Sequence, residues 1–344
     1  MKFEKRVLTT LNRCYSATDI LVDGVRRILV ATEGEGACLA WAAPGYEAEH
    51  AVWEGPGGTM SMVPVPGTHG EFLAVQKFFR MYDWEEAKLV HVRPAGDCRY
   101  EVQDLLNLPY IHRFDLLPAN GRLYFIGCTL ATHKASREDW SGEPGKVWVA
   151  EYTPGGPLQP RVLREGCTRN HGSSRLVRGG LARSLVSCDQ GAFEVTPPQQ
   201  PGGDWTLTPL MDWPISDIAA IDIDGDGELE YATIEPFHGS YFRVYKRYAG
   251  AWRMVYEHPE VSDFYHVVVA DTLAGRPVFI GGCRRGQQQL FYVHAASTAP
   301  LVLRAELIDE GVGPSNVHVV HEEGRDLLVS ANREKAEVAL YTVT

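Results

Sequence analysis

Residues 111–128 read IHRFDLLPANGRLYFIGC, and residues 265–283 repeat the same plan as YHVVVADTLAGRPVFIGGC. Each stretch begins with an apolar segment led by a histidine, turns at a glycine nine residues later, and ends on a cysteine 16 or 17 residues after that histidine. Short runs of β-branched and aromatic residues on either side of a glycine turn are typical of antiparallel β-hairpins. The two stretches therefore predict the same hairpin at two places in the chain.

Seven segments along the chain lead such a unit, and helical periodicity is nearly absent between them. From Ser16 onward, their central positions are separated by 45, 51, 59, 45, 50 and 52 residues. The segments are Tyr15-Ser16-Ala17, Met60-Ser61-Met62, Ile111-His112-Arg113, Asn170-His171-Gly172, Ile215-Ser216-Asp217, Tyr265-His266-Val267 and Val317-His318-Val319. A period of roughly 40–50 residues with four short strands is the pattern of a β-propeller. Seven units predict an all-β, seven-bladed β-propeller.

The last unit, from Val317 to Thr344, has room for only three strands. A further β-type run, from Phe3 to Leu11, precedes the first unit. We expect this N-terminal strand to complete the last blade, because that closes the ring and removes a free sheet edge. Residues 1–344 would then form a single β-propeller domain. The alternative is a pair of β-sandwiches, which does not account for the in-register spacing.

The composition disfavours several classes of partner. The chain has 344 residues and a formal net charge of −11, whereas nucleic acids and anionic membranes attract basic proteins. The N-terminal MKFEKRVLTTLNR lacks the apolar core of a signal peptide, and no window approaches 18 apolar residues. The seven cysteines are scattered and form no CxxC motif. We therefore expect reduced thiols, a cytoplasmic protein, and neither nucleic acid nor a membrane as its partner.

The propeller geometry places the leading residue of each unit around the axis. In blade order this ring reads Ser16, Ser61, His112, His171, Ser216, His266 and His318. Neutral imidazoles are common ligands of Zn²⁺, Mn²⁺ and Fe²⁺, so we expect a divalent transition metal bound by His112, His171, His266 and His318. A histidine at a strand start is more often a hydrogen-bonded structural residue. A one-residue slip would also turn Asn316 inward in place of His318.

A second set of polar residues is expected on the same face, where the second strand of each unit ends. His133 and His238 are the candidate bases that would remove a proton from a ligand. Arg284, Arg285 and Arg333 are the candidates for stabilising a developing enolate. The alternative for all of them is a solvated loop surface.

Two of the loops that follow the second strand of a unit, residues 77–84 and 132–140, are long and rich in aromatic and cationic residues. We call them the two long elbows. Sugar rings stack on aromatic side chains, and cationic side chains bind carboxylates. We expect a small polar or anionic ligand, a sugar above all, to contact Lys77, Tyr82, Trp84, Trp140 and Asn316. The tryptophans could instead pack against neighbouring blades.

The segment Asp222-Ile-Asp224-Gly-Asp226-Gly-Glu228-Leu-Glu230 resembles the acidic turn of FG-GAP and VCBS repeats in integrin-type propellers. In those repeats the turn joins the first two strands of a blade and can hold Ca²⁺. Carboxylates on alternate residues suit a hard cation. The resemblance implies a structural calcium site formed by Asp222, Asp224, Asp226 and Glu230. Unlike an EF-hand, the segment has Thr233 at its twelfth position, and the alternative is a solvated acidic turn.

The histidine ring is similar in architecture to that of two propeller lyase families, the oligogalacturonide lyases and the aldos-2-ulose dehydratases. No motif specific to either family aligns, so the resemblance assigns no catalytic residue. Together with the ring, it favours a metal-dependent lyase or isomerase acting on an acidic or oxidised carbohydrate at the channel mouth. The competing hypothesis is a non-catalytic binding module for a protein, peptide or sugar, because a fold alone does not settle function.

Overall fold

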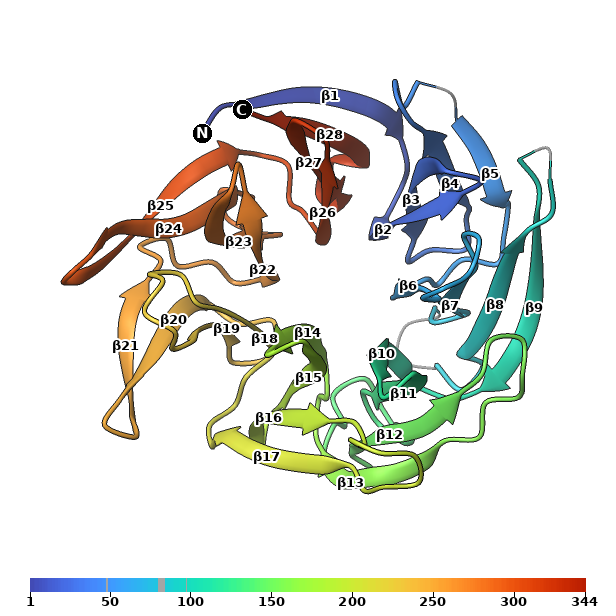
Figure 1. The fold of residues 1–344 in the computed structure, drawn as a ribbon, viewed down its shortest axis with the longest axis horizontal. Helices are drawn as coiled ribbons and strands as arrows, with labels where there is room; N and C mark the ends of the chain where they lie inside the picture. Colours follow the sequence, from blue (N-terminus) through green and yellow to red (C-terminus); the bar gives the residue numbers. More distant parts are fainter. Residues whose placement is uncertain (48, 80–83, 97) are drawn as a thin grey trace.

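The computed structural model describes every residue except 48, 80–83 and 97. The described residues form seven four-stranded antiparallel sheets that follow one another around a central axis (Figure 1). In each sheet the innermost strand lies at the axis and the outermost at the perimeter. The seven-bladed β-propeller predicted from the repeats is confirmed.

In blades 1 to 6 the strands run outward from the axis in chain order. Blades 1 to 3 consist of β2 (Cys14–Val22), β3 (Val25–Thr32), β4 (Cys38–Ala42) and β5 (Glu49–Trp53); β6 (Met62–Pro64), β7 (Phe72–Gln76), β8 (Lys88–Pro94) and β9 (Tyr100–Asn107); and β10 (Ile111–Ala119), β11 (Arg122–Thr129), β12 (Gly145–Tyr152) and β13 (Arg161–Cys167). Blades 4 to 6 consist of β14 (Gly172–Arg178), β15 (Leu181–Cys188), β16 (Gly191–Thr196) and β17 (Thr206–Met211); β18 (Asp217–Ile221), β19 (Glu230–Glu235), β20 (Tyr241–Tyr248) and β21 (Ala251–Glu257); and β22 (Tyr265–Leu273), β23 (Arg276–Cys283), β24 (Leu290–Thr298) and β25 (Leu301–Asp309). Blade 7 consists of β26 (Asn316–Glu322), β27 (Arg325–Asn332), β28 (Glu337–Val343) and, outermost, β1 (Phe3–Thr10).

The predicted glycine turns are two-residue hairpin turns in which both central residues have positive φ. They are Asp23-Gly24 (φ 50° and 78°), Asn120-Gly121 (46° and 77°) and Ala274-Gly275 (48° and 72°). Turns of this kind match the right-handed twist of the strands that they join, and glycine adopts positive φ without steric cost. They therefore fix the pairing of the first two strands in blades 1, 3 and 6.

The first strand of the chain closes the ring, as predicted. β1 pairs with β28 in antiparallel register, with Phe3 opposite Val343 and Thr10 opposite Glu337. Figure 1 shows the two chain ends side by side in this blade. The Lys5 ammonium lies 2.8 Å from Asp309 Oδ2 and 2.6 Å from Glu337 Oε1, so it joins the closing strand to blades 6 and 7.

The core is divided among the spaces between the blades. Each of the seven apolar clusters in the described residues joins adjacent blades, two in six clusters and three in the one that contains Tyr15. The contact between blades 7 and 1, for example, buries Val30 and Trp41 against Val329 and Leu340. Because each blade packs on both of its neighbours, the starts of the inner strands are held at defined positions around the axis.

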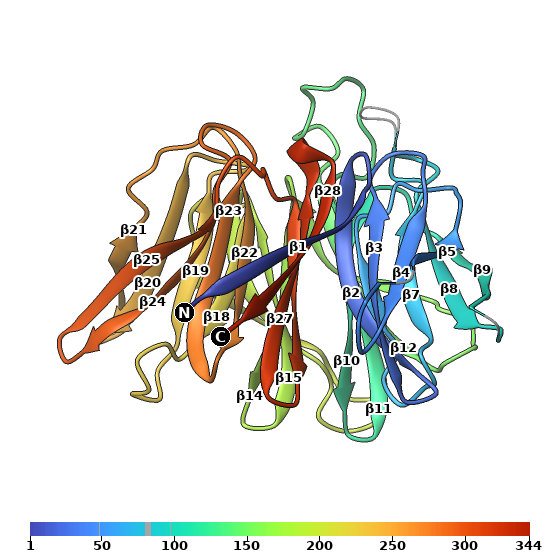
Figure 2. The same cartoon turned by 90° about the horizontal axis from the view of Figure 1, so that it is seen from above.

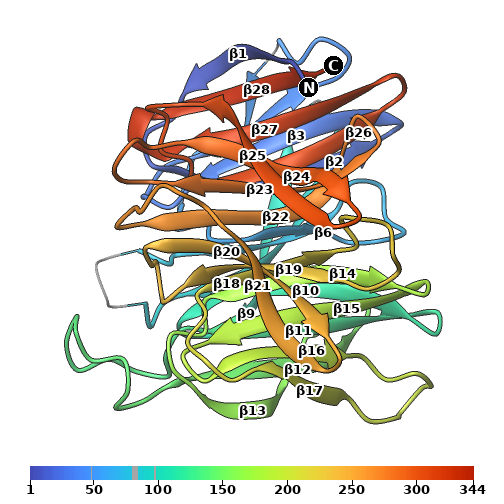
Figure 3. The same cartoon turned by 90° about the vertical axis from the view of Figure 1, so that its left-hand side faces the viewer.

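One face of the ring carries the longer connections. The loop between β11 and β12 stands out from this face in Figures 2 and 3. Antiparallel pairing places the start of each inner strand on the same face as the end of the second strand, as in the pair Ile111 and Thr129. Among the described residues, no helix is long and apolar enough to cross a membrane.

Removing residues 1–10 should lower the melting temperature by about 10 °C or more, because β28 then has an unpaired edge and Lys5 is lost. Circular dichroism melting checks this. A synthetic peptide of residues 1–11, added in excess, should restore part of the loss by mass action, whereas a scrambled peptide should not. An unchanged melting temperature in the truncated chain would show that strand closure does not stabilise the ring.

Candidate metal centre and ligand cavity

A cavity of about 690 Å³ opens at the axis on the face with the long connections. Its lining includes five polar residues near the axis: Tyr15, His112, His171, His238 and His266. Aromatic side chains from the two long elbows and from the loop between β19 and β20 line it as well. The residues come from blades 1 to 6, so the cavity exists only when the ring is assembled.

Three of the five polar residues occupy equivalent β-bulges. The pairing of β2 with β3 skips Tyr15, that of β10 with β11 skips His112, and that of β22 with β23 skips His266. A bulge inserts one extra residue and re-aims its side chain. The three side chains meet: Tyr15 Oη lies 3.1 Å from His266 Nε2 and 3.4 Å from His112 Nε2. Tyr15 therefore takes the place in blade 1 that the sequence assigned to Ser16.

The other two imidazoles reach the cluster from blades 4 and 5. His171 immediately precedes β14, and His238 lies in the loop after β19 with a φ of 48°. His171 Nε2 and His238 Nε2 are 3.1 Å apart. Potential ligand atoms of His171, His238 and His266 all lie within 4.8 Å of one another, a separation suited to a single metal ion.

The second nitrogen of two of these imidazoles has a fixed acceptor. His171 Nδ1 is 2.7 Å from Asp217 Oδ2, and His266 Nδ1 donates to the Ser315 carbonyl oxygen. These contacts favour a proton on Nδ1 and leave a lone pair on Nε2, as in histidines that ligate metals. The donor set therefore fits Zn²⁺, Mn²⁺ or Fe²⁺. His112 differs, because within the described residues its buried Nδ1 has no hydrogen-bond partner.

Burial controls protonation in the cluster. It lowers the pKa of His112, His238 and His266 well below the usual value, and nearby cationic groups act in the same direction. Burial also raises the pKa of the Tyr15 hydroxyl to about 12. For Asp217, burial acts upward, but the contact with His171 outweighs it and lowers the pKa. These three imidazoles are therefore neutral near pH 7, the form in which a histidine binds metal.

Aromatic rings and one ammonium form the wall above His171 and His238. Phe237 stacks on His238 with ring centroids 4.0 Å apart, and Trp140 lies 5.4 Å from Phe237. Trp84 follows at 6.2 Å from Trp140. The buried Lys134 Nζ lies 3.2 Å from the centre of the Trp140 ring and donates to the Arg137 carbonyl oxygen. Burial lowers the Lys134 pKa to about 8.

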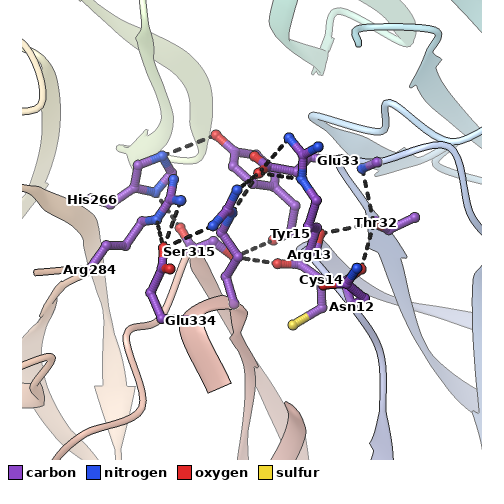
Figure 4. A network of polar contacts seen from close by, with 12 residues as sticks. Asn12, Arg13, Cys14, Tyr15, Thr32, Glu33, His266, Arg284, Ser315 and Glu334 are labelled. Carbon is purple, nitrogen blue, oxygen red and sulfur yellow. Dashed lines mark hydrogen bonds and ion pairs between the residues drawn. The ribbon is translucent and has the colours of Figure 1, made fainter. Parts of the chain in front are cut away.

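A chain of ion pairs forms the opposite side of the cavity and crosses the closure of the ring (Figure 4). Arg284 binds Glu334 at 2.7 Å, and Glu334 also lies 3.0 Å from Arg333. Arg333 and Arg13 both bind Glu33. Three guanidinium groups share two carboxylates, so this chain of ion pairs, which we call the rim network, has a net charge of +1.

The structure does not bring His318 to the histidine cluster. His318 lies further along β26, lines a separate cavity on the axis, and binds Asp19 Oδ1 through Nε2 at 2.6 Å. Ser315 and Asn316 occupy the start of this blade. Asn316 donates to the Tyr15 carbonyl oxygen and accepts from Arg113, so it supports the cluster from below and does not line the ligand cavity.

Other residues expected at the site are also placed elsewhere. His133 is exposed and binds Glu85 at 2.7 Å, Arg285 lies over the Phe264 ring, and Lys77 pairs with Glu86 at 3.5 Å. None of these three lines the cavity, so their predicted roles have no support in its geometry. Arg284, Trp84 and Trp140 do line it, whereas Arg333 reaches it only through Glu33. Tyr82 lies outside the described residues.

The acidic turn faces away from this site and already holds a cation of the chain itself. The ammonium of Lys246, on β20, lies 2.7 Å from Asp224 Oδ2, 2.8 Å from Asp226 Oδ2 and 2.5 Å from Glu230 Oε1. Both oxygens of Asp222 accept hydrogen bonds from backbone N–H groups of the turn. Although the three aspartate carboxylates lie close enough together for a metal, this arrangement does not fit the predicted calcium site, because a side chain occupies its centre.

Sequence reasoning did not single out Tyr15, Asp217 or Lys134 as functional residues. Tyr15 could have been found by aligning Cys14-Tyr15-Ser16 with Ile111-His112-Arg113 and Tyr265-His266-Val267. Asp217 directly follows the ring position Ser216, but nothing in the pattern shows that it contacts His171 in the neighbouring blade. Lys134 is one charge among several on its loop, and only the packing distinguishes it.

The melting temperature should fall as the pH is lowered from about 7.5 to 5.5. Burial lowers the pKa of His112, His238, His258 and His266, so below the unfolded value of about 6.5 the unfolded chain binds more protons. His321 acts in the opposite sense, since Asp326 and Asp271 raise its pKa. Substituting His321→Gln should therefore steepen the decline. A flat profile in calorimetry would contradict the neutral state of the cluster.

Comparisons with known proteins support the fold and give no information about the site. No family model matches the chain, and no curated protein matches its sequence. Among solved structures it is similar to the luciferin-regenerating enzyme, with a TM-score of 0.53 and 9% sequence identity over 99% of this chain and 95% of the other. At this identity the structural similarity assigns neither functional residues nor an activity to this chain. The resemblances to FG-GAP and VCBS repeats and to propeller lyases thus gain no support here. The comparisons place the chain among β-propellers, one of which is an enzyme, and assign it to no family.

Proposed function

We propose that the chain is a metal-dependent enzyme, a lyase or isomerase acting on an acidic or oxidised carbohydrate. The proposed ligands of a divalent transition metal are His171, His238 and His266. The observation that carries the proposal is the convergence of these imidazoles, with Asp217 and Ser315 orienting two of them. His238, expected from the sequence to be a base, becomes a ligand in this proposal.

A bound metal would supply Lewis acidity, which polarises a carbonyl or carboxyl group and acidifies the neighbouring C–H bond. The chain itself supplies a base next to that position. His112 is neutral and contacts the Tyr15 hydroxyl, so in this proposal its free lone pair accepts the proton from carbon. Returning the proton to a leaving group would complete an elimination, and returning it to the adjacent carbon would complete an isomerisation.

The cavity walls support a ligand that is both a sugar and an anion. Trp84, Trp140 and Phe237 offer aromatic faces of the kind on which sugar rings stack. The rim network has a net charge of +1, and among the described residues no carboxylate forms an ion pair with Lys134. Positive charge therefore lies both on the wall that carries Lys134 and on the opposite wall. The structurally similar luciferin-regenerating enzyme is an example of a propeller that is an enzyme. It says nothing about the substrate of this chain.

The protein purified without a His tag should contain, or take up, about one equivalent of transition metal. His171→Ala and His266→Ala should each reduce this below about 0.2 equivalents, because each removes one of three ligands. His318→Ala is the matched control and should retain full occupancy. Asp217→Asn should weaken metal binding by about 10–100-fold, since the carboxylate orients His171. Elemental analysis that finds no metal, and no uptake on addition, would remove the proposed mechanism.

Uronic acids should quench the fluorescence of the cavity tryptophans more strongly than glucose does. Lys134→Met should weaken the binding of galacturonate or glucuronate by about 10–100-fold, because a charged hydrogen bond is lost in a buried setting. Lys77→Met, on the other long elbow, is the control and should leave binding unchanged. Metal binding without any uronate binding would refute the substrate class alone. Tight binding of ligand without turnover would favour the binding module.

A further inference from the structure

The acidic turn of blade 5 is built around a buried ammonium. Lys246 lies opposite Glu230 in the pairing of β19 with β20, and its side chain is 4% exposed. Its ammonium forms ion pairs with three carboxylates, those of Asp224, Asp226 and Glu230, and donates a hydrogen bond to Asp224 Oδ2. These carboxylates raise the pKa of Lys246 against the effect of burial. The amine is therefore charged near pH 7.

The remaining carboxylate of the turn is committed to the backbone. Asp222 Oδ1 accepts from the Gly225 N–H at 2.7 Å, and Oδ2 accepts from the Gly227 N–H at 2.9 Å. Gly225 and Gly227 both have positive φ, which the tight turn requires. Glu230 also accepts from the Ile223 N–H, so both ends of the turn are tied to this group. The carboxylates of Asp224, Asp226 and Glu230 thus surround Lys246 Nζ, while Asp222 holds the backbone of the turn.

We propose that Lys246 is the resident cation of this turn and replaces the calcium ion that its acidic pattern implies. The chain then needs no calcium to fold blade 5. The turn is also a latent calcium site, because removing the amine leaves the carboxylates of Asp224, Asp226 and Glu230, the oxygen ligands that Ca²⁺ prefers, without a cation between them. A buried charge cluster that loses its counter-ion is strongly destabilised until another cation replaces it.

The two strands joined by this turn also carry parts of the metal centre. β18 begins at Asp217, which orients His171, and β19 ends three residues before His238. The turn lies at the opposite ends of both strands. An internal ammonium holds these strands together whether or not calcium is present in solution.

The first test is on the unaltered protein. Its melting temperature should change by less than about 1 °C between EDTA and about 5 mM CaCl₂, and calorimetric titration with CaCl₂ should show no binding at the turn. Stoichiometric binding with a clear rise in melting temperature would overturn the proposal. This measurement does not depend on the folding of any variant, nor on transition metal at the histidine cluster.

The second test removes the amine and keeps its aliphatic chain. Lys246→Met should melt about 5–10 °C lower in EDTA and regain most of that loss in about 5 mM CaCl₂. Lys146→Met, which loses a single ion pair with an exposed glutamate, is the matched control and should show no calcium response. Adding Glu230→Gln to Lys246→Met should abolish the rescue. A folded Lys246→Met protein with no calcium response would show that the ammonium does not stand in for a metal.

Discussion

Each blade is held by apolar contacts with the blades on either side, and this packing sets where every inner strand reaches the axis. The candidate site depends on it, because its polar residues come from separate blades and meet only there. Tyr15, His112 and His266 are brought together by bulges at the starts of β2, β10 and β22. The ladder of each blade anchors its own bulge, so the positions of the three side chains are set by backbone pairing.

Burying several charged imidazoles together would be unfavourable, because they would lose hydration and repel one another. Two features of the structure avoid this. The rings stay neutral, since burial lowers the pKa of His112, His238 and His266. The carboxylate of Asp217 is held by His171 in the neighbouring blade. Charged groups are kept to the walls: the rim network pairs most of its own charge, and Lys134 rests on an indole ring. The cavity is therefore lined by neutral imidazoles of His112, His238 and His266 near the axis and by cationic groups on its walls.

The sequence was sufficient for the fold because the repeat carries it: strand length, glycine turns and buried cysteines recur at one spacing, and the missing strand of the last blade identifies the closure. It also predicted that His112, His171 and His266 lie near one another at the axis, because they share one position in that repeat, whereas their role as metal ligands stays a prediction. It misplaced His318, since unit lengths between 45 and 59 residues leave the start of β26 uncertain by two positions. Bulges such as the one at Tyr15, and a partner such as Lys246, depend on pairing between strands, which a single sequence does not display.

The distribution of the site along the chain has a consequence for biosynthesis. Tyr15 comes from the first blade and His266 from the sixth, and Ser315, which orients His266, precedes the seventh. A ribosome must therefore release most of the polypeptide before the imidazoles can gather. Partly made chains lack part of the cluster, so the proposed metal would bind only after translation and ring closure are both complete.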